Sequence, residues 1–181
     1  MRVLSLLTNT SQKSILLKAL FFLLVAASFS ACKEPQNPYV FDTEGQKIKD
    51  EQVIRQYFRA NNVDTTKVVR TESGLYYLNI TPGTGDLLKV GDIADVHYIG
   101  RNIYGNEFDN SYNRGSSFSV TVGATGPNGV IQGWNEGLQL MKPGEEAFLY
   151  IPSHLGYGPR GYSSIPGNAV LIFEMKVLRK R

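Results

Sequence analysis

Ile93-Ala94-Asp95-Val96-His97-Tyr98-Ile99-Gly100 opens the segment around which the predicted fold is built. Apolar and polar residues alternate along it, as in a half-buried strand. The segment continues through Glu107-Phe108-Asp109 and Phe118-Ser119-Val120-Thr121-Val122 and closes with Val130-Ile131-Gln132-Gly133-Trp134. Large apolar side chains and one carboxylate fall at strand ends and at a helix start, which is the composition of a small-ligand pocket. They are Tyr98, Phe108, Phe118, Ile131, Trp134 and Asp109.

Length and charge narrow the class of protein. With 181 residues, 42% hydrophobic and 19% charged, the chain can form one globular domain, or one domain with a tail. The formal charge of +3 comes from Arg2, Lys13 and Lys18, because residues 1–31 contain no acid and the rest holds 16 basic and 16 acidic side chains. A neutral chain gives no electrostatic reason to expect nucleic-acid binding.

Residues 1–31 are typical of a signal peptide. They combine a basic beginning, the apolar run Ala19–Ala27 and the small-residue exit Ser28-Phe29-Ser30-Ala31. The apolar run is shorter than the roughly 20 residues of a comfortable membrane span, although an uncleaved anchor helix is the alternative interpretation.

Cys32 is the only cysteine of the chain, so no intrachain disulfide can form. Its position after Ser30-Ala31 resembles a bacterial lipoprotein signal, which implies lipidation of Cys32 by acyl chains such as palmitate; Phe29 departs from that pattern. Several acyl chains make membrane anchoring stable. Because Lys33 rather than aspartate follows, the resemblance points to the outer membrane of a bacterial envelope, on its periplasmic or surface face. The alternative is a buried free thiol.

Two segments separate this signal from the main domain. Residues 32–45 are predicted to be a lipidated tether, and residues 46–71 a helical extension whose helix spans Gln46–Ala60. Either this helix dimerises or docks to a partner, or its apolar stripe packs against the main domain. The stripe consists of Ile48, Ile54, Tyr57 and Phe58.

Residues 72–181 are predicted to form an α+β domain. Short alternating segments bounded by Gly, Pro or Asn predict an antiparallel sheet, and one helix is predicted over Gln132–Met141, with Trp134 and Leu138 on its apolar face. The expected strands are Leu75–Ile80, Ile93–Gly100, Phe118–Val122, Ala147–Ile151 and Ala169–Leu178.

The order of four motifs resembles the FKBP-type peptidyl-prolyl cis-trans isomerases. The motifs are Asp95–Gly100, Gly105–Ser111, Val130–Leu138, and Gly156–Gly161 followed by Ile165-Pro166 and Asn168–Glu174. The resemblance covers residues 72–181 and implies a curved antiparallel sheet wrapped around one short helix. It also implies an enzyme that rotates X-Pro bonds without a cofactor.

The resemblance implies a role for each pocket residue. Trp134 matches the floor on which the prolyl ring rests, the backbone N–H of Ile131 matches the donor to a substrate carbonyl, and the Tyr157 hydroxyl matches a ligand donor. Asp109 matches the pocket carboxylate, with the Tyr98 hydroxyl and Arg114 as its expected partners. The implied catalytic residues are Tyr98, Asp109, Ile131 and Tyr157, and the implied substrate-binding residues are Phe108, Phe118, Val130, Trp134, Ile165 and Phe173.

The same residues allow a purely structural interpretation. Aromatic side chains at inward strand positions usually belong to a core. Asp109 fits that interpretation less well, because a carboxylate among aromatic rings is costly unless it is paired. His97 is expected to face away from the pocket, and His154 lies in a loop; neither has a second ligand nearby, so no metal site is predicted.

The function expected from the sequence is folding assistance by X-Pro isomerisation in envelope proteins. The alternative is a module that grips a proline-containing segment of a partner in surface machinery, with incidental turnover. A holdase chaperone ranks last, because the loop 153–168 is too short to hold an inserted domain. Macrolide inhibitors are expected ligands through the resemblance. The insert Ala124–Gly129 before Val130 lengthens the pocket rim relative to compact family members.

Overall fold

The computed structural model describes residues 43–126 and 129–181. The predicted signal peptide 1–31, Cys32 and most of the predicted tether lie outside the described residues. The structure therefore bears on the predicted helix and on the main domain.

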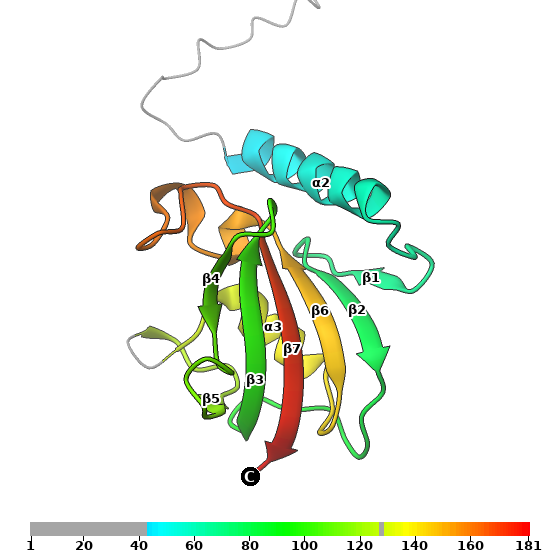
Figure 1. Ribbon diagram of the computed structural model, residues 1–181, viewed down its shortest axis with the longest axis vertical. Helices are drawn as coiled ribbons and strands as arrows, with labels where there is room; N and C mark the ends of the chain where they lie inside the picture. The colour runs from blue at the N-terminus through cyan, green and yellow to red at the C-terminus, as the bar shows by residue number, and fades with distance from the viewer. Residues whose placement is uncertain (1–42, 127–128) are drawn as a thin grey trace, which may run out of the picture. The chain divides into compact units, whose positions relative to one another are not determined.

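Within the described residues, seven strands form one antiparallel sheet in the order β1-β2-β6-β7-β3-β4, with β5 paired to β3 (Figure 1). In the described part of the chain, two α-helices and two short 3₁₀ turns accompany the sheet. The elements are α2 (Thr43–Ala60), β1 (Val68–Arg70), β2 (Tyr76–Thr81), β3 (Ile93–Asn102), β4 (Glu107–Asn110), β5 (Phe118–Thr121), α3 (Gln132–Gln139), β6 (Glu146–Ile151), the turns Ser153–Leu155 and Gly158–Arg160, and β7 (Leu171–Lys180).

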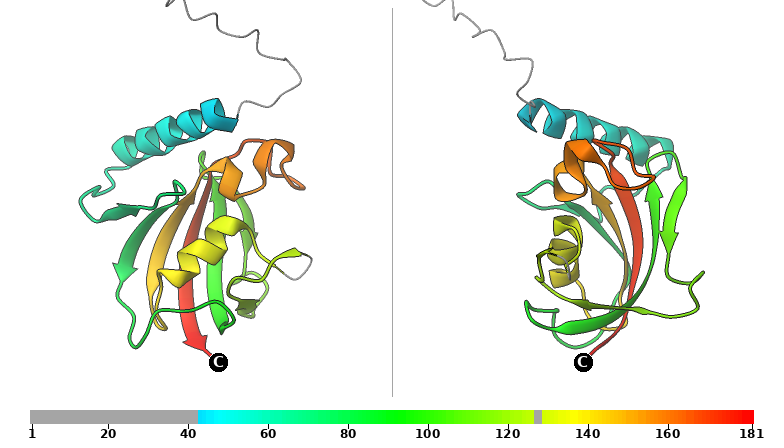
Figure 2. Two further views of the ribbon diagram at one scale, coloured as in Figure 1. Left: turned by 180° about the vertical axis from the view of Figure 1, so that it is seen from behind. Right: turned by 90° about the vertical axis from the view of Figure 1, so that its left-hand side faces the viewer.

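The sheet curves around α3, which lies against its concave face (Figure 2). The long strands β3 and β7 form its centre, in a register that pairs Tyr98 with Met175 and Gly100 with Phe173. Strand residues alternate between the two faces, so Leu149 faces α3 while its neighbour Tyr150 faces the other way. The predicted fold class, α+β with a curved antiparallel sheet around one short helix and a preceding helix, is confirmed.

Helix α3 packs against the sheet through two glycines, which have no side chains. Gly133 and Gly137 are four residues apart and therefore share a face of the helix. A Cβ atom at Gly133 would overlap the side chain of Ile151, and one at Gly137 would overlap Leu149. The two glycines thus let the helix backbone rest directly on β6.

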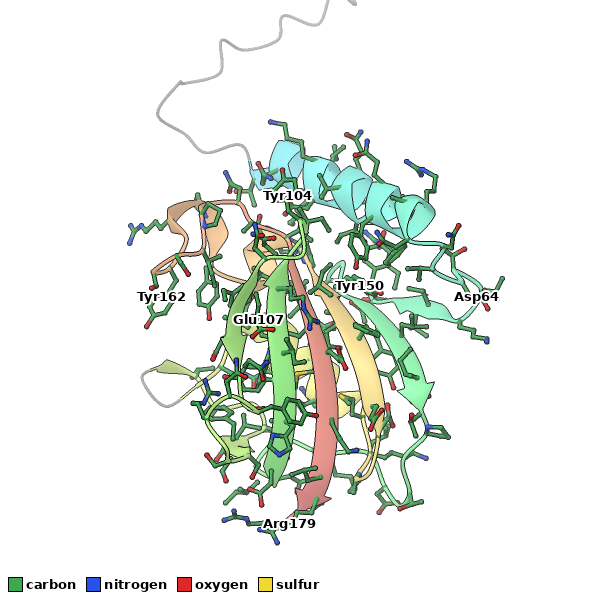
Figure 3. The ribbon with its side chains drawn as sticks, in the orientation of Figure 1. Asp64, Tyr104, Glu107, Tyr150, Tyr162 and Arg179 are labelled. Atoms are coloured by element: carbon green, nitrogen blue, oxygen red, sulfur yellow. The ribbon has the colours of Figure 1, made fainter. Side chains whose placement is uncertain are left out.

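A second apolar cluster covers the opposite, convex face and is closed by α2. Ile54 and Phe58 of α2 are buried there, and the ring of Phe58 meets Tyr76 and Tyr150 edge-on at centroid distances of 5.5 and 4.7 Å. Tyr150 lies beneath α2 in Figure 3. The aromatic members of this convex cluster are Tyr57, Phe58, Tyr76, Phe148 and Tyr150. The helix therefore packs against its own domain.

Several expectations differ in detail from the structure: α3 ends at Gln139 instead of Met141, and β7 spans Leu171–Lys180 instead of Ala169–Leu178. Helix α2 begins at Thr43, three residues before the predicted start, and so includes the end of the predicted tether. Ile48 is 61% exposed and is not part of the buried stripe, which instead follows Asp50, Ile54 and Phe58 at a spacing of four. The short strands β1 and β4 were not predicted as strands, because three or four half-exposed residues carry little alternation.

Candidate functional site

A cavity of about 720 Å³ opens beside α3 on the concave side of the sheet. Helix α3, strands β3, β4, β5 and β7, and the loop after β6 all contribute lining residues. The structure brings together around this one cavity all ten residues that the sequence predicted for the site: Tyr98, Phe108, Asp109, Phe118, Val130, Ile131, Trp134, Tyr157, Ile165 and Phe173. Their individual roles stay predictions.

Trp134 forms the aromatic floor of the cavity. It occupies the first turn of α3 and is 4% exposed. Its ring meets Tyr98 and Phe173 edge-on, at centroid distances of 4.7 and 5.2 Å, a geometry that aromatic pairs prefer. The indole N–H is buried and has no hydrogen-bond partner within residues 43–126 and 129–181.

One wall carries a compact polar group of three side chains. The Tyr98 hydroxyl donates to Asp109 Oδ2 at 2.5 Å and accepts a hydrogen bond from Arg114 Nη2 at 2.5 Å. Arg114 also pairs with Asp109 through its other guanidinium nitrogen, and its Cζ lies 5.3 Å from the centre of the Tyr98 ring. The expected pairing of Asp109 with Tyr98 and Arg114 is therefore present.

The contacts among these three side chains shift the pKa values of the Asp109 carboxyl and the Tyr98 phenol. Partial burial acts to raise the pKa of Asp109, but the hydrogen bonds from Tyr98 and Arg114 and the charge of Arg114 outweigh it, so the pKa lies below its usual range. Burial and the hydrogen bond to Asp109 raise the pKa of Tyr98 to about 12. Near neutral pH the wall therefore presents a carboxylate and a protonated phenol.

Two tyrosines border the opening of the cavity. Tyr157 and Tyr162 stack with centroids 5.2 Å apart and planes 14° apart. Tyr162 is 65% exposed and projects outward in Figure 3. Its backbone exchanges hydrogen bonds of 2.9 and 2.8 Å with Ile165, which closes the overhanging loop. Sequence reasoning missed Tyr162, because an aromatic residue between glycine and serines in a loop carries no periodic signal.

The described part of the rim segment after β5 is held by α3. The Asn135 amide accepts a hydrogen bond from the backbone N–H of Gly123 at 2.8 Å and donates to the carbonyl of Ala124 at 2.9 Å. Gly126 and Gly129 line the cavity. The insert recognised in the sequence thus borders the site.

Neither histidine lines the cavity. His97 bonds Ser111 at 3.0 Å and stacks on Tyr112 at 4.4 Å, on the convex side, as expected. His154 lies at the start of the loop after β6. Among the residues that the structure describes, no group of three or more His, Cys, Asp or Glu side chains is arranged to hold a metal ion.

Comparison with known sequences identifies the class of protein that this fold and cavity define. The profile of the family described as FKBP-type peptidyl-prolyl cis-trans isomerase matches residues 85–178. The chain belongs to this family.

The most informative relatives are bacterial and fungal. The chain is 44% identical over 121 residues to the FKBP-type peptidyl-prolyl cis-trans isomerase FkpA of Aeromonas hydrophila, an alignment that covers 67% of this chain and 43% of that protein. It is 40% identical over 110 residues to FK506-binding protein 1 of Candida glabrata, which covers 60% of this chain and 94% of the relative. The chain thus spans less than half of the FkpA relative.

A solved structure resembles the chain beyond the family domain. The crystal structure of FkpA from Escherichia coli superposes with a TM-score of 0.63 at 28% identity, covering 97% of this chain and 74% of that one. The match supports the fold of sheet and central helix described above.

Proposed function

We propose that the chain is a peptidyl-prolyl cis-trans isomerase that acts on X-Pro bonds without covalent chemistry. The observation that carries the proposal is the apolar cavity with Trp134 as its floor and the Tyr98–Asp109–Arg114 group on one wall. Rotation about a peptide bond has a barrier of about 18–20 kcal/mol, which arises from amide resonance. No bond is broken, so a shaped and partly desolvated site is sufficient.

In this proposal the apolar surroundings lower the barrier. The prolyl ring rests on the indole of Trp134, between Tyr98 and Phe173. The rings of these two residues stand edge-on to the indole. Removing water from the substrate carbonyl disfavours the charge-separated resonance form of the amide. Phe108, Phe118, Val130 and Ile165 complete the walls and rim that exclude water.

The polar groups act on the twisted amide. The backbone N–H of Ile131 and the hydroxyl of Tyr157 donate hydrogen bonds to substrate carbonyls; bonds that form only as the amide rotates stabilise the transition state more than the ground state. Asp109 has an orienting and electrostatic role. Its lowered pKa supports this assignment, because a carboxylate that stays ionised at neutral pH is a poor proton donor.

The proposal is tested by following cis-to-trans relaxation of short peptides with different residues before proline, in the presence of the full chain. We expect acceleration that Trp134→Leu removes and that Tyr157→Phe, which deletes one hydroxyl group, reduces. Tyr104→Ala is the matched control, because Tyr104 is 87% exposed and does not line the cavity. Absence of acceleration by the folded wild type would overturn the enzyme proposal and support the binding module.

We further propose that the protein is anchored by lipidated Cys32 in a bacterial envelope, where proline-containing envelope proteins are its clients. The support is the signal-like sequence of residues 1–31 and the single cysteine that follows it. In the part of the chain that the structure describes, no helix is long and apolar enough to cross a membrane. Mass spectrometry of the mature N-terminus and membrane fractionation of Cys32→Ser test the anchor; an unmodified Cys32 would contradict it.

Macrolide binding is proposed for the same cavity. Its volume of about 720 Å³ lies within the range of small-molecule sites, and one relative is named as an FK506-binding protein. Since Trp134 is the only tryptophan, its fluorescence reports directly on occupancy of the floor. We expect a saturable change on titration with FK506, and no change in Trp134 emission would contradict macrolide binding.

A further inference from the structure

Helix α2 carries a buried carboxylate that the site described above does not include. Asp50 is 1% exposed and faces the first residues of the loop after β6. Its Oδ2 accepts hydrogen bonds from the backbone N–H of Ser153 at 2.8 Å and from the Ser153 hydroxyl at 2.6 Å. Its Oδ1 accepts a third from Gln46 at 2.7 Å. Residues 103 positions apart in sequence are thus joined by two hydrogen bonds.

The loop needs this contact because it cannot cap itself. Ser153 begins a 3₁₀ turn, and the first N–H groups of a helical turn require an external acceptor. The capping position is occupied by Pro152, whose side chain offers no acceptor, and no side-chain cap forms there. Asp50 supplies the missing acceptor from a distant helix.

The segment that Asp50 fixes leads directly into the cavity wall. Leu155 is 7% exposed and packs in the core on the concave side. Tyr157 follows two residues later and lines the cavity, as does Ile165 on the overhanging loop. The start of this segment therefore determines where its cavity-lining side chains lie.

A second set of contacts ties the same point to the floor helix. His154 bonds the carbonyl of Ser73 through Nε2 at 2.9 Å, and the Ser73 hydroxyl donates to the carboxylate of Glu136 at 2.7 Å. Glu136 lies in α3, two residues after Trp134. Ser73 thus links His154 of the loop after β6 to Glu136 of α3, and Asp50 joins α2 to the neighbouring Ser153.

Stability alone does not account for a carboxylate at this position. Among the described residues no Lys, Arg or His forms an ion pair with Asp50, whose hydrogen-bond donors are all neutral. Burial of a carboxylate without a counter-ion is unfavourable relative to well-packed apolar side chains. A requirement for loop geometry explains why a polar acceptor stands here.

We propose that Asp50 is a positioning residue, which makes α2 part of the isomerase site although the family profile begins only at residue 85. This inference rests on the proposed function of the cavity. Asp50 contacts no substrate; it sets the position of the segment that carries Tyr157 and Ile165 through Ser153.

The test compares Asp50→Ala with Asp50→Asn in the full chain. Asparagine keeps an acceptor toward Ser153, so we expect its kcat/KM to stay within about twofold of wild type, whereas alanine lowers it by about tenfold through misplacement of wall residues. Peptide-level hydrogen exchange of residues 153–168 is measured in parallel; alanine should accelerate it by about tenfold and asparagine should not.

Leu78→Ala is the stability control, because Leu78 is 8% exposed in the convex cluster and forms no bond to the loop. At a temperature where all variants are folded, it should leave both kcat/KM and loop exchange unchanged. If Leu78→Ala reproduces the effects of Asp50→Ala, or if Asp50→Asn fails to restore the loop, the positioning role is wrong. If the wild type shows no isomerase activity, the proposed function fails, and loop exchange still decides whether Asp50 holds the segment.

Discussion

Among the described residues, the two faces of the sheet carry aromatic clusters with nearly the same ring geometry, yet only the rings of the concave cluster line the main cavity. On the concave face Tyr98 meets Trp134 at 4.7 Å and 82°; on the convex face Phe58 meets Tyr150 at 4.7 Å and 81°. Helix α2 packs Ile54 and Phe58 onto the convex rings, while the main cavity lies beside Trp134 of α3. A cluster of aromatic rings is therefore not enough to identify a binding site. The concave site is distinguished by the cavity above Trp134 and by Asp109, which is paired with Tyr98 and Arg114.

The largest expected effect is a loss of stability when the convex cluster is disrupted. Phe58→Ala removes the ring that closes the convex cluster and should lower the free energy of unfolding by about 3–5 kcal/mol. Because Phe58 neither lines the cavity nor bonds Ser153 as Asp50 does, kcat/KM should stay near wild type at a temperature where the variant is folded. Urea unfolding and peptide assays measure both quantities. A loss below about 1 kcal/mol would show that α2 contributes little to the fold.

The next effect concerns the carboxylate that distinguishes the concave cluster. Asp109→Ala should lower kcat/KM about tenfold, which corresponds to about 1.4 kcal/mol of transition-state stabilisation. Stability should change by less than about 1 kcal/mol, because the side chains of Asp109 and Arg114 are 41% and 46% exposed.

Glu107→Gln is the matched control for that change, since it neutralises a carboxylate on the same strand that does not line the main cavity. It should leave peptide isomerisation unchanged. Equal losses in the two variants would indicate a general charge effect instead of a specific role for Asp109.

Alkaline pH should reveal a buried phenol on each face. Burial raises the pKa of Tyr150 to about 12, and burial together with Asp109 raises that of Tyr98 to about 12, against 10 for a free phenol. The unfolded chain then loses these protons first, so both contributions to stability decline as pH rises from about 10 through about 12.

Tyr98→Phe and Tyr150→Phe should each flatten that decline, as measured by urea unfolding at several pH values. Only Tyr98→Phe should also lower activity at neutral pH, because only Tyr98 contacts the cavity. Some slope should remain, since burial also raises the pKa of Tyr77. Lower activity in Tyr150→Phe would contradict the separation of the two faces.

The smallest expected change in the free energy of unfolding is at Ile48, which lies at the edge of the convex cluster. Ile48→Ser should change the free energy of unfolding by less than about 0.5 kcal/mol, because the side chain is 61% exposed. Val53→Ser, a change of similar chemistry at a position that packs against the cluster, should cost more. Equal losses in urea unfolding would place Ile48 within the packed surface.

The elements that could be predicted from the sequence are those with strong periodicity or a specific motif. Alternation over β3 and β7 and the apolar face of α3 predicted the central sheet and its helix. The motif order predicted the residues around the cavity, because a family's pocket residues keep their positions in the chain.

The features that could not be predicted from the sequence depend on contacts between segments far apart in the chain. Asp50 on a helix has the local pattern of a solvated side chain, and its burial depends on the distant Ser153, which supplies two of its three donors. Ile48 has an apolar side chain of the kind found in cores, but the buried face of α2 consists of Asp50, Ile54 and Phe58. Tyr162 is placed by its stacking on Tyr157. No local signal predicts such pairings.

The glycines of α3 have a consequence for how the depth of the cavity can change. Gly133 and Gly137 touch β6 and line no part of the cavity, yet their missing Cβ atoms set the height at which the helix carries Trp134. A methyl group at either position would push α3, and Trp134 with it, away from β6 while the identity of every wall residue stayed the same. Relatives with shallower or deeper cavities can therefore differ at positions that no ligand ever meets.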